Sequence, residues 1–213
     1  EGDAAAHGGG GGTILVADRR SVTQSQGGVA IEHTVPPEPW MGVTGYGGQR
    51  QIGQYLALSG IGATSSGGVV NLDRDYGGIG ARLIWTGTWA SRPLTFSAGV
   101  DADRLREKRQ GFVNNNGAQG ALRRDEDDRV TSTDAYLQAE WAAFSALSIT
   151  LGVRTSRVNY ESTDHYINVA NPDDSGSRNY NNTSPIAGIV WHVLDELNVY
   201  ASYGKGFETP TFA

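Results

Sequence analysis

Apolar and polar residues alternate one by one along most of this chain. Between residues 79 and 89, Ile79, Leu83 and Trp85 occupy one parity, whereas Arg82 and Thr86 occupy the other. A period of two residues is typical of a β-strand with one apolar face and one polar face. The pattern therefore predicts an all-β structure.

Eight segments show this alternation. They are roughly 10–13 residues long, close to the roughly 9–11 that a tilted strand needs to cross a bilayer and above the mean of about 5–6 for strands of soluble proteins. The predicted strands are Val22–Thr34, Trp40–Arg50, Ile79–Trp89, Leu94–Arg106, Val130–Trp141, Leu147–Tyr160, Ser184–Val193 and Leu197–Phe207.

The connections between these segments alternate in length. Short connections lie at 35–39, 90–93, 142–146 and 194–196, and long ones at Gln51–Gly78, Glu107–Arg129 and Glu161–Thr183. Short turns at one end and long loops at the other are typical of outer-membrane β-barrels. An antiparallel transmembrane barrel segment is thus the predicted fold class, with a soluble β-sandwich as the alternative that alternation by itself leaves open.

Four of the five tryptophans lie beside the short connections: Trp40, Trp89, Trp141 and Trp191. Such a row is typical of the aromatic girdle at a membrane interface, here on the periplasmic side. Trp40 fits less well, because Met41 and Val43 have the opposite parity. The outward cations Arg104, Arg106, Arg157 and Lys205 all fall at the long-loop ends, where a strand has left the hydrocarbon.

Composition limits the alternatives. The chain has 213 residues, a net charge of -6 and no cysteine, so disulfides and thiolate chemistry are excluded. The mean hydropathy of -0.38 suggests a soluble protein. A membrane barrel can have the same value, because the hydropathies of the alternating apolar and polar residues cancel along each strand. No apolar run reaches the roughly 18 residues of a transmembrane helix. Scattered basic residues in an acidic chain give no expectation of nucleic-acid binding.

Several motifs resemble TonB-dependent outer-membrane receptors. The segment Leu197–Phe212, read as LNVYASYGKGFETPTF, is similar to a late strand of these barrels, and similar stretches occur at 70–78, 134–141 and 151–154. The resemblance covers about residues 40 to 212. It implies a large barrel of the 22-stranded class whose lumen holds a plug. It also implies uptake of a ferric siderophore or similar scarce chelate, energised by TonB.

On this basis we expect residues 1–213 to be part of such a barrel domain, with 1–21 as a loop and 22–207 as strands and loops. No plug domain and no TonB-contacting box is recognisable in the sequence. TonB would then act through a plug region of the parent protein. The surroundings would be the lipid bilayer and lipopolysaccharide of the bacterial outer membrane.

Candidate ligand-binding residues are few. Arg123, Arg124 and Arg178 are candidates for an anionic iron chelate, because guanidinium groups bind carboxylates in a bidentate manner. His165, in a long loop, and Tyr200, on a lumen-facing parity, are further candidates. The acidic run at 125–128 is interpreted as a solvated loop, with ligand capture or a divalent cation as the alternative.

The sequence predicts no enzyme, metal site or cofactor. There is no Gly-x-Ser-x-Gly elbow or P-loop, and the four histidines lack metal-ligand spacing. Two alternatives to the receptor remain open: a passive porin or small structural outer-membrane barrel, and an outer-membrane barrel enzyme. Pairing between the first and last strands would favour a complete small barrel.

Overall fold

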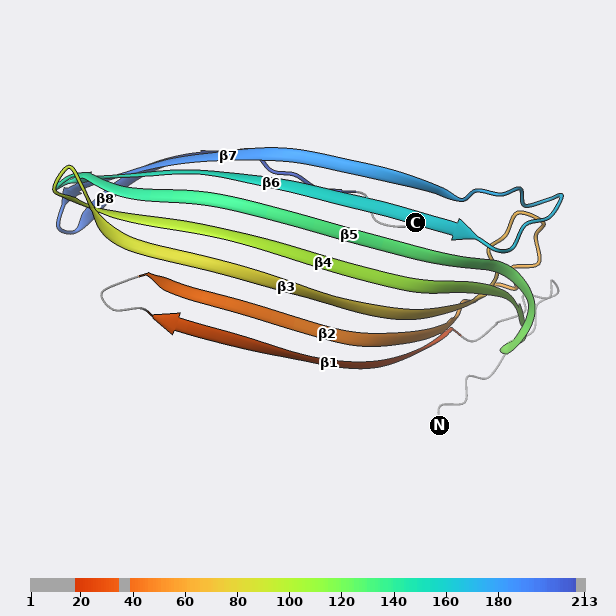
Figure 1. The fold of residues 1–213 in the computed structure, drawn as a ribbon. Coiled ribbons are helices and arrows are strands. Elements are labelled where there is room, and N and C mark those ends of the chain that lie inside the picture. Colours follow the sequence, from red (N-terminus) through yellow and green to blue (C-terminus); the bar gives the residue numbers. More distant parts are fainter. Residues whose placement is uncertain (1–17, 35–38, 210–213) are drawn as a thin grey trace.

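The chain forms one antiparallel β-sheet in which neighbours in sequence are neighbours in space (Figure 1). This computed structural model describes residues 18–34 and 39–209. The eight strands are β1 (Arg19–Thr34), β2 (Trp40–Tyr55), β3 (Val69–Trp89), β4 (Arg92–Asn115), β5 (Ala118–Phe144), β6 (Leu147–Asp164), β7 (Gly176–Leu194) and β8 (Leu197–Gly204). The prediction of eight antiparallel strands is confirmed. The glycine-rich tract at 7–12 and residues 35–38 of the first short connection lie outside the described residues.

Most strands are longer than predicted, and every extension beyond a few residues lies at the long-loop end. β3 begins at Val69 rather than Ile79, and β5 reaches back to Ala118 rather than Val130. In these extensions both faces carry charged residues, so the alternation of apolar and polar residues disappears. The strand pairing nevertheless continues through these extensions, without a shift between β3 and β4 and with register shifts near Phe112 between β4 and β5.

The predicted long loop Glu107–Arg129 is wrong. β4 and β5 are joined there by the two-residue turn Asn116–Gly117, with φ angles of 51° and 92°. Both values are positive, as the tight hairpin turn favoured by Asn-Gly requires. Asn114 accepts a hydrogen bond from the Gly117 amide at 2.7 Å. The acidic run 125–128 and Arg123 and Arg124 therefore lie on a strand.

The other two long connections are real but shorter, at 56–68 and 165–175. The first folds onto the β4–β5 hairpin: the Gly68 amide donates to the Phe112 carbonyl and the Asn114 amide to the Ser59 carbonyl, both at 2.8 Å. Beside these contacts lies Val69, which is fully buried. This end of the sheet is thus an ordered continuation of the strands.

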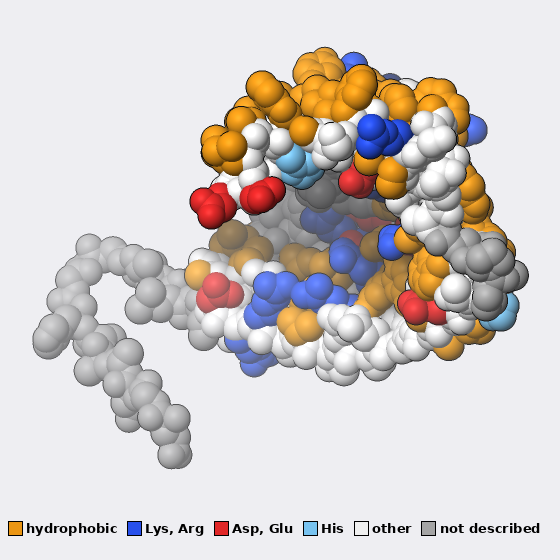
Figure 2. All heavy atoms as spheres, turned by 90° about the vertical axis from the view of Figure 1, so that its left-hand side faces the viewer, with side chains coloured by type: hydrophobic (Ala, Val, Ile, Leu, Met, Phe, Trp, Pro, Cys, Tyr) orange, Lys and Arg blue, Asp and Glu red, His pale blue; other side chains and the backbone are white. Residues whose placement is uncertain are grey.

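The sheet is strongly curved and its two faces differ. Figure 2, a view from the short-turn end, shows apolar side chains on the outer surface and charged ones in the hollow. Outer-face residues such as Val100, Leu137 and Leu151 are apolar yet 51–58% exposed. We call the concave face the inner wall and the convex face the outer wall.

The predicted outward position is seen for Trp89, Trp141 and Trp191 and is wrong for Trp40. Trp89 and Trp141 share the outer wall, with ring centroids 4.5 Å apart, and Trp191 lies on the outer parity of β7. Trp40 instead lies on the inner wall, over Gly42, while Met41 and Val43 face outward. The β1–β2 register sets this parity and places Trp40 opposite Thr34.

β1 and β8 do not pair with each other among the described residues, so the eight strands form an open, curved sheet. The expected pairing of a complete eight-stranded barrel is therefore not seen in this part of the chain. No helix within residues 18–34 and 39–209 is long and apolar enough to cross a membrane.

Candidate ligand-binding site

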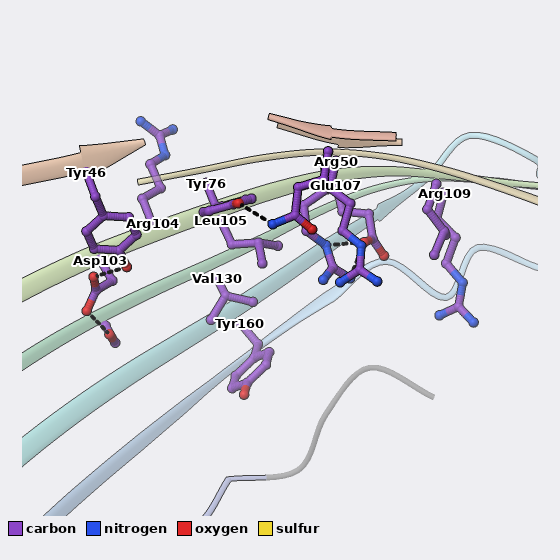
Figure 3. Close-up of a pocket in the computed structure, with 14 residues that line it drawn as sticks. Tyr46, Arg50, Tyr76, Asp103, Arg104, Leu105, Glu107, Arg109, Val130 and Tyr160 are labelled. Atoms are coloured by element: carbon purple, nitrogen blue, oxygen red, sulfur yellow. Dashed lines mark hydrogen bonds and ion pairs between the residues drawn. The ribbon is translucent and has the colours of Figure 1, made fainter. Parts of the chain in front are cut away.

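A cavity of about 650 Å³ opens on the inner wall, at the long-loop half of β1–β6 (Figure 3). The strand extensions that the sequence pattern missed supply part of its lining, namely Leu72, Arg74, Tyr76, Glu107 and Arg109. The side chains that give it polar character are Gln24, Tyr46, Arg50, Arg74, Tyr76, Asp103, Glu107, Arg109, Ser132 and Tyr160. Arginines and tyrosines predominate among them.

Arg50 and Arg74 are cross-strand partners on β2 and β3, so two guanidinium groups lie side by side on the wall. Arg74 is neutralised by Glu107 of β4, whose Oε2 accepts from Arg74 Nε at 2.6 Å. Glu107 is only 5% exposed. Arg50 has no ion pair in the described residues, and its buried Nε atom has no hydrogen-bond partner there. The cavity therefore contains an arginine whose hydrogen-bonding capacity is not used by the described residues.

The tyrosines hold their positions through hydrogen bonds and close packing on glycine. Tyr46 donates to Asp103 Oδ1 at 2.6 Å, and Tyr76 donates to Gln26 Oε1 at 2.9 Å. Tyr76 covers Gly48, where an added Cβ would lie 2.7 Å from the phenol oxygen. Glycine at this position thus allows the ring to lie flat against the wall and leaves space above it.

Above the cavity, toward the β4–β5 turn, the inner wall carries a second ionic group. Glu126 of β5 is 7% exposed and lies opposite Arg109, and it accepts a hydrogen bond from Arg124. Burial raises the pKa of Glu126 above its ordinary value, while the hydrogen bond from Arg124 acts in the opposite direction. This part of the wall remains balanced in charge because Arg124 is committed to Glu126.

Below the cavity, toward the short turns, Asp134 and Arg154 pair on the inner wall. Arg154 Nε donates to Asp134 Oδ1 at 3.0 Å, and Ser156 donates to the same oxygen. Both side chains lie on the polar parity of their strands, and they form an ion pair across β5 and β6. The charges of Asp134 and Arg154 compensate each other within the wall, so the pair needs no ligand to explain its presence.

The five residues proposed from the sequence do not form one site. Arg124 faces the inner wall, but Arg123 donates to the Ile61 carbonyl at 2.6 Å and so anchors the 56–68 connection. Arg178 lies on β7 opposite Tyr160, not in a loop. His165 does lie in a loop, where Nε2 is 3.0 Å from Asp127 Oδ2. Tyr200, 78% exposed on β8, is near the short-turn end, far along the strands from the arginines.

Sequence reasoning missed Arg50, Arg74 and Arg109. Arg50 was the last residue of a predicted strand, and the other two were assigned to loops. Continuing the parity of β3 from Arg82 through Gly80 and Gly78 would have placed Tyr76 and Arg74 on the inner face. Among the described residues no group of three or more histidine, aspartate or glutamate side chains is arranged to hold a metal ion.

The chain was compared with known proteins. Residues 12–213 match the family model "TonB dependent receptor-like, beta-barrel". Similar solved structures include the ferric citrate transporter FecA in its unliganded form (16% identity, TM-score 0.71), covering 87% of this chain and 27% of that one. The siderophore receptor PiuA from Acinetobacter baumannii gives 14% identity and a TM-score of 0.73, covering 89% of this chain and 33% of that one.

The alcaligin outer-membrane receptor FauA from Bordetella pertussis gives 16% identity and a TM-score of 0.69, covering 88% of this chain and 29% of that one. The chain thus spans about a third or less of the length of these structures, each of which it resembles in fold. The family consists of outer-membrane receptors and transporters, not enzymes. With its open, curved antiparallel sheet and its match over residues 12–213, the chain belongs to the TonB-dependent receptor-like β-barrel family.

Proposed function

We propose that this chain is part of an outer-membrane receptor that takes up an anionic metal chelate, most simply a ferric siderophore, through a TonB-driven step. The observation that carries the proposal is Arg50, which faces the inner-wall cavity with a buried Nε atom that has no partner in the described residues. Carboxylate or catecholate oxygens of a chelate would accept hydrogen bonds from the part of the Arg50 guanidinium that faces the cavity.

The surrounding residues fit such a ligand. Tyr46, Tyr76 and Tyr160 offer flat, amphipathic surfaces, which supply contact area at low conformational cost. Arg109 adds a second cation to the upper side of the cavity. The five residues proposed from sequence stay candidates, with Arg124 and Arg178 nearest in register to this part of the inner wall.

In the same proposal, residues 1–213 form part of the barrel domain of a bacterial outer-membrane protein. TonB would engage the plug region of the parent protein, and the outer wall would contact the lipid bilayer and lipopolysaccharide. Relatives of similar fold that are named as transporters and siderophore receptors support the ligand class.

The test is ligand binding by the full-length receptor carrying Arg50→Gln. Isothermal titration with ferric complexes of the carboxylate, catecholate and hydroxamate classes would identify the accepted class. Arg50→Gln should then weaken binding of the accepted anionic complex by about tenfold or more, because a desolvated charge-assisted contact is lost.

The matched control is Arg82→Gln, which removes an exposed inner-wall arginine at the short-turn half of β3. It should leave the affinity unchanged. Equal weakening by both variants would show that only the general charge of the wall matters, and an unchanged affinity in Arg50→Gln would reject the site.

A further inference from the structure

Four arginines gather on the outer wall, on the side of the sheet opposite the inner cavity. They are Arg104 and Arg106 on β4, Arg129 on β5 and Arg157 on β6, and all four are exposed. Figure 3 shows Arg104 pointing away from the other labelled side chains. We call this group the outer arginine cluster.

Carboxylates lie near the cluster, since Asp73, Asp75 and Asp127 line a pocket together with Arg106 and Arg129, but none of these three forms an ion pair with a cluster arginine among the described residues. Arg129 pairs with Glu161 at 3.3 Å, and both side chains are about half exposed. Arg104, Arg106 and Arg157 have no ion pair or hydrogen bond among residues 18–34 and 39–209, although Asp75 is the register partner of Arg106. Arg106 and Arg129 lie directly opposite each other across β4 and β5. Like charges in this position are unfavourable, and a bound anion would relieve them.

The height of the cluster on the wall identifies the environment. Below it the outer faces of β4, β5 and β6 are apolar or hydroxylic down to the tryptophan girdle. Arg104 is ten residues from Leu94, which at about 3.3 Å per residue and a tilt of about 40° places it roughly 25 Å above the girdle level. That is also about the height of the apolar band of an outer-membrane barrel. The guanidinium groups thus lie at the depth of lipid head groups.

We propose that the outer arginine cluster is a binding site for the phosphate groups of an anionic glycolipid of the surrounding leaflet. Several guanidinium groups on adjacent strands present N–H donors to the phosphate oxygens of one head group, while the acyl chains lie along the apolar outer wall. The inference rests on the proposed function only for the location and orientation of the barrel in its membrane. Of the cluster only Arg104 also borders the inner-wall cavity, and its side chain points away from the other labelled residues there (Figure 3).

The experiment uses the full-length receptor in neutral-lipid nanodiscs and bisphosphorylated lipid A as the probe. Wild type should bind lipid A more tightly than the enzymatically dephosphorylated lipid, and binding should weaken with salt. The triple variant Arg104→Gln, Arg106→Gln, Arg157→Gln should lose about a hundredfold in lipid A affinity, since each cation near an anionic surface contributes roughly fivefold. Native mass spectrometry of bound lipid measures the lipid A affinity of wild type and of the triple variant.

The matched control removes three exposed cations elsewhere: Arg20→Gln, Arg92→Gln and Lys205→Gln. Its net charge equals that of the triple variant, and its lipid A affinity should equal that of wild type. Equal losses in both variants, or no preference of wild type for the phosphorylated lipid, would overturn the site. If the triple variant folds poorly, Arg157→Gln alone should still weaken binding about fivefold.

Chelate binding, measured on the same samples, separates this inference from the proposed function. The double variant Arg106→Gln, Arg157→Gln, which changes no residue that lines the cavity, should bind the chelate like wild type and still lose lipid A affinity. A loss of lipid A binding with intact chelate binding supports the lipid site. Lipid A binding that is unchanged in the triple variant rejects the site whether or not any chelate binds.

Discussion

At the scale of single residues, the inner wall depends on glycines that accept aromatic rings. An added Cβ at Gly48 would lie 2.7 Å from both the Tyr76 phenol oxygen and the Ser25 carbonyl oxygen. The backbone contact leaves no simple way to relieve the overlap by rotating the ring alone. The Tyr76 hydroxyl also forms hydrogen bonds with Gln24 and Gln26, and a displaced ring would lose them.

Gly48→Ala should therefore destabilise the full-length receptor by about 1–3 kcal/mol, as overpacking in other proteins does. The control is Gly45→Ala on the same strand, where nothing lies within 4 Å of the new Cβ. Thermal unfolding in detergent measures both variants. An unchanged unfolding temperature in Gly48→Ala would contradict the packing described here.

Glu126 gives the upper wall a pH dependence. Burial raises its pKa above the ordinary value of 4.5. Between that value and the raised native pKa, the folded protein keeps a proton that the unfolded chain has released. The contribution of Glu126 to the free energy of unfolding therefore falls as the pH rises through this window. Glu126→Gln should remove that component and flatten the stability curve above pH 4.5.

Asp173 provides a control of opposite sign. The side-chain and backbone hydrogen bonds from Ser175 lower the pKa of Asp173 below 3.8. Its contribution is complete above 3.8 and is lost as the pH falls through the native pKa. Asp173→Asn should thus differ from wild type in its pH profile only on the acidic side, as chemical unfolding at a series of pH values would show. Parallel curves for wild type and Glu126→Gln would contradict the burial argument.

The sequence predicted few single-residue roles correctly. Parity places Asp134 and Arg154 on the same polar face, but their pairing with each other follows from the β5–β6 register. The roles of Arg123 and Trp40 were not predicted, because each depends on a partner that is remote in sequence: Ile61 for Arg123, and the β1–β2 register for Trp40. Arg50 could be placed on a strand, but the absence of a neutralising acid beside it becomes visible only from the positions of its neighbours.

At the scale of elements, two of the tight hairpin turns, β3–β4 and β4–β5, use different residues for a similar geometry with two positive φ angles. Asn116–Gly117 is the preferred pair for two positive φ angles, whereas Ala90 and Ser91 adopt φ angles of 50° and 60° with side chains that disfavour them. The β3–β4 turn is therefore the less favourable one.

Exchanging the two turns tests this difference. Ala90→Asn with Ser91→Gly should stabilise the β3–β4 hairpin by about 1 kcal/mol, and Asn116→Ala with Gly117→Ser should destabilise the β4–β5 hairpin by about as much. Hydrogen exchange at the adjoining strand ends is the measurement. Similar changes of the same sign in both hairpins would show that the φ angles do not control turn stability.

Strand existence was predictable throughout, but strand ends were predictable only on the short-turn side. There the outer face stays apolar up to the turn, as a lipid-facing wall requires. On the other side β4 and β5 continue past Arg106 and Arg129 with charges on both faces, and this charge pattern was interpreted as a long loop. Backbone pairing needs no apolar face, so the pattern underestimates strands that leave the membrane.

At the scale of the whole molecule, the assignment of the outer wall to lipid makes a direct prediction. Leu137 and Gln138 are neighbours on β5 that face outward and inward, respectively. Leu137 is four residues from Trp141, or about 10 Å above the girdle, well inside the apolar band. Leu137→Arg should destabilise the membrane-inserted receptor by about 2–4 kcal/mol.

Gln138→Arg adds the same side chain on the polar inner wall and should be nearly neutral. The yield of receptor folded into lipid vesicles, measured by resistance to protease, compares the two variants. A larger loss for Gln138→Arg than for Leu137→Arg would reverse the assignment of the two walls.

The length of the β4–β5 hairpin has a consequence for how such a protein can change over evolutionary time. β5 has 27 residues, about 90 Å along its path, so a large part of it extends beyond an apolar band of about 25 Å. In that part neither face is held to apolar residues by the membrane. Substitutions there can alter ligand preference without disturbing insertion, whereas the band below must keep its composition. The structure thus separates the region free to acquire a new specificity from the region that keeps the protein in its membrane.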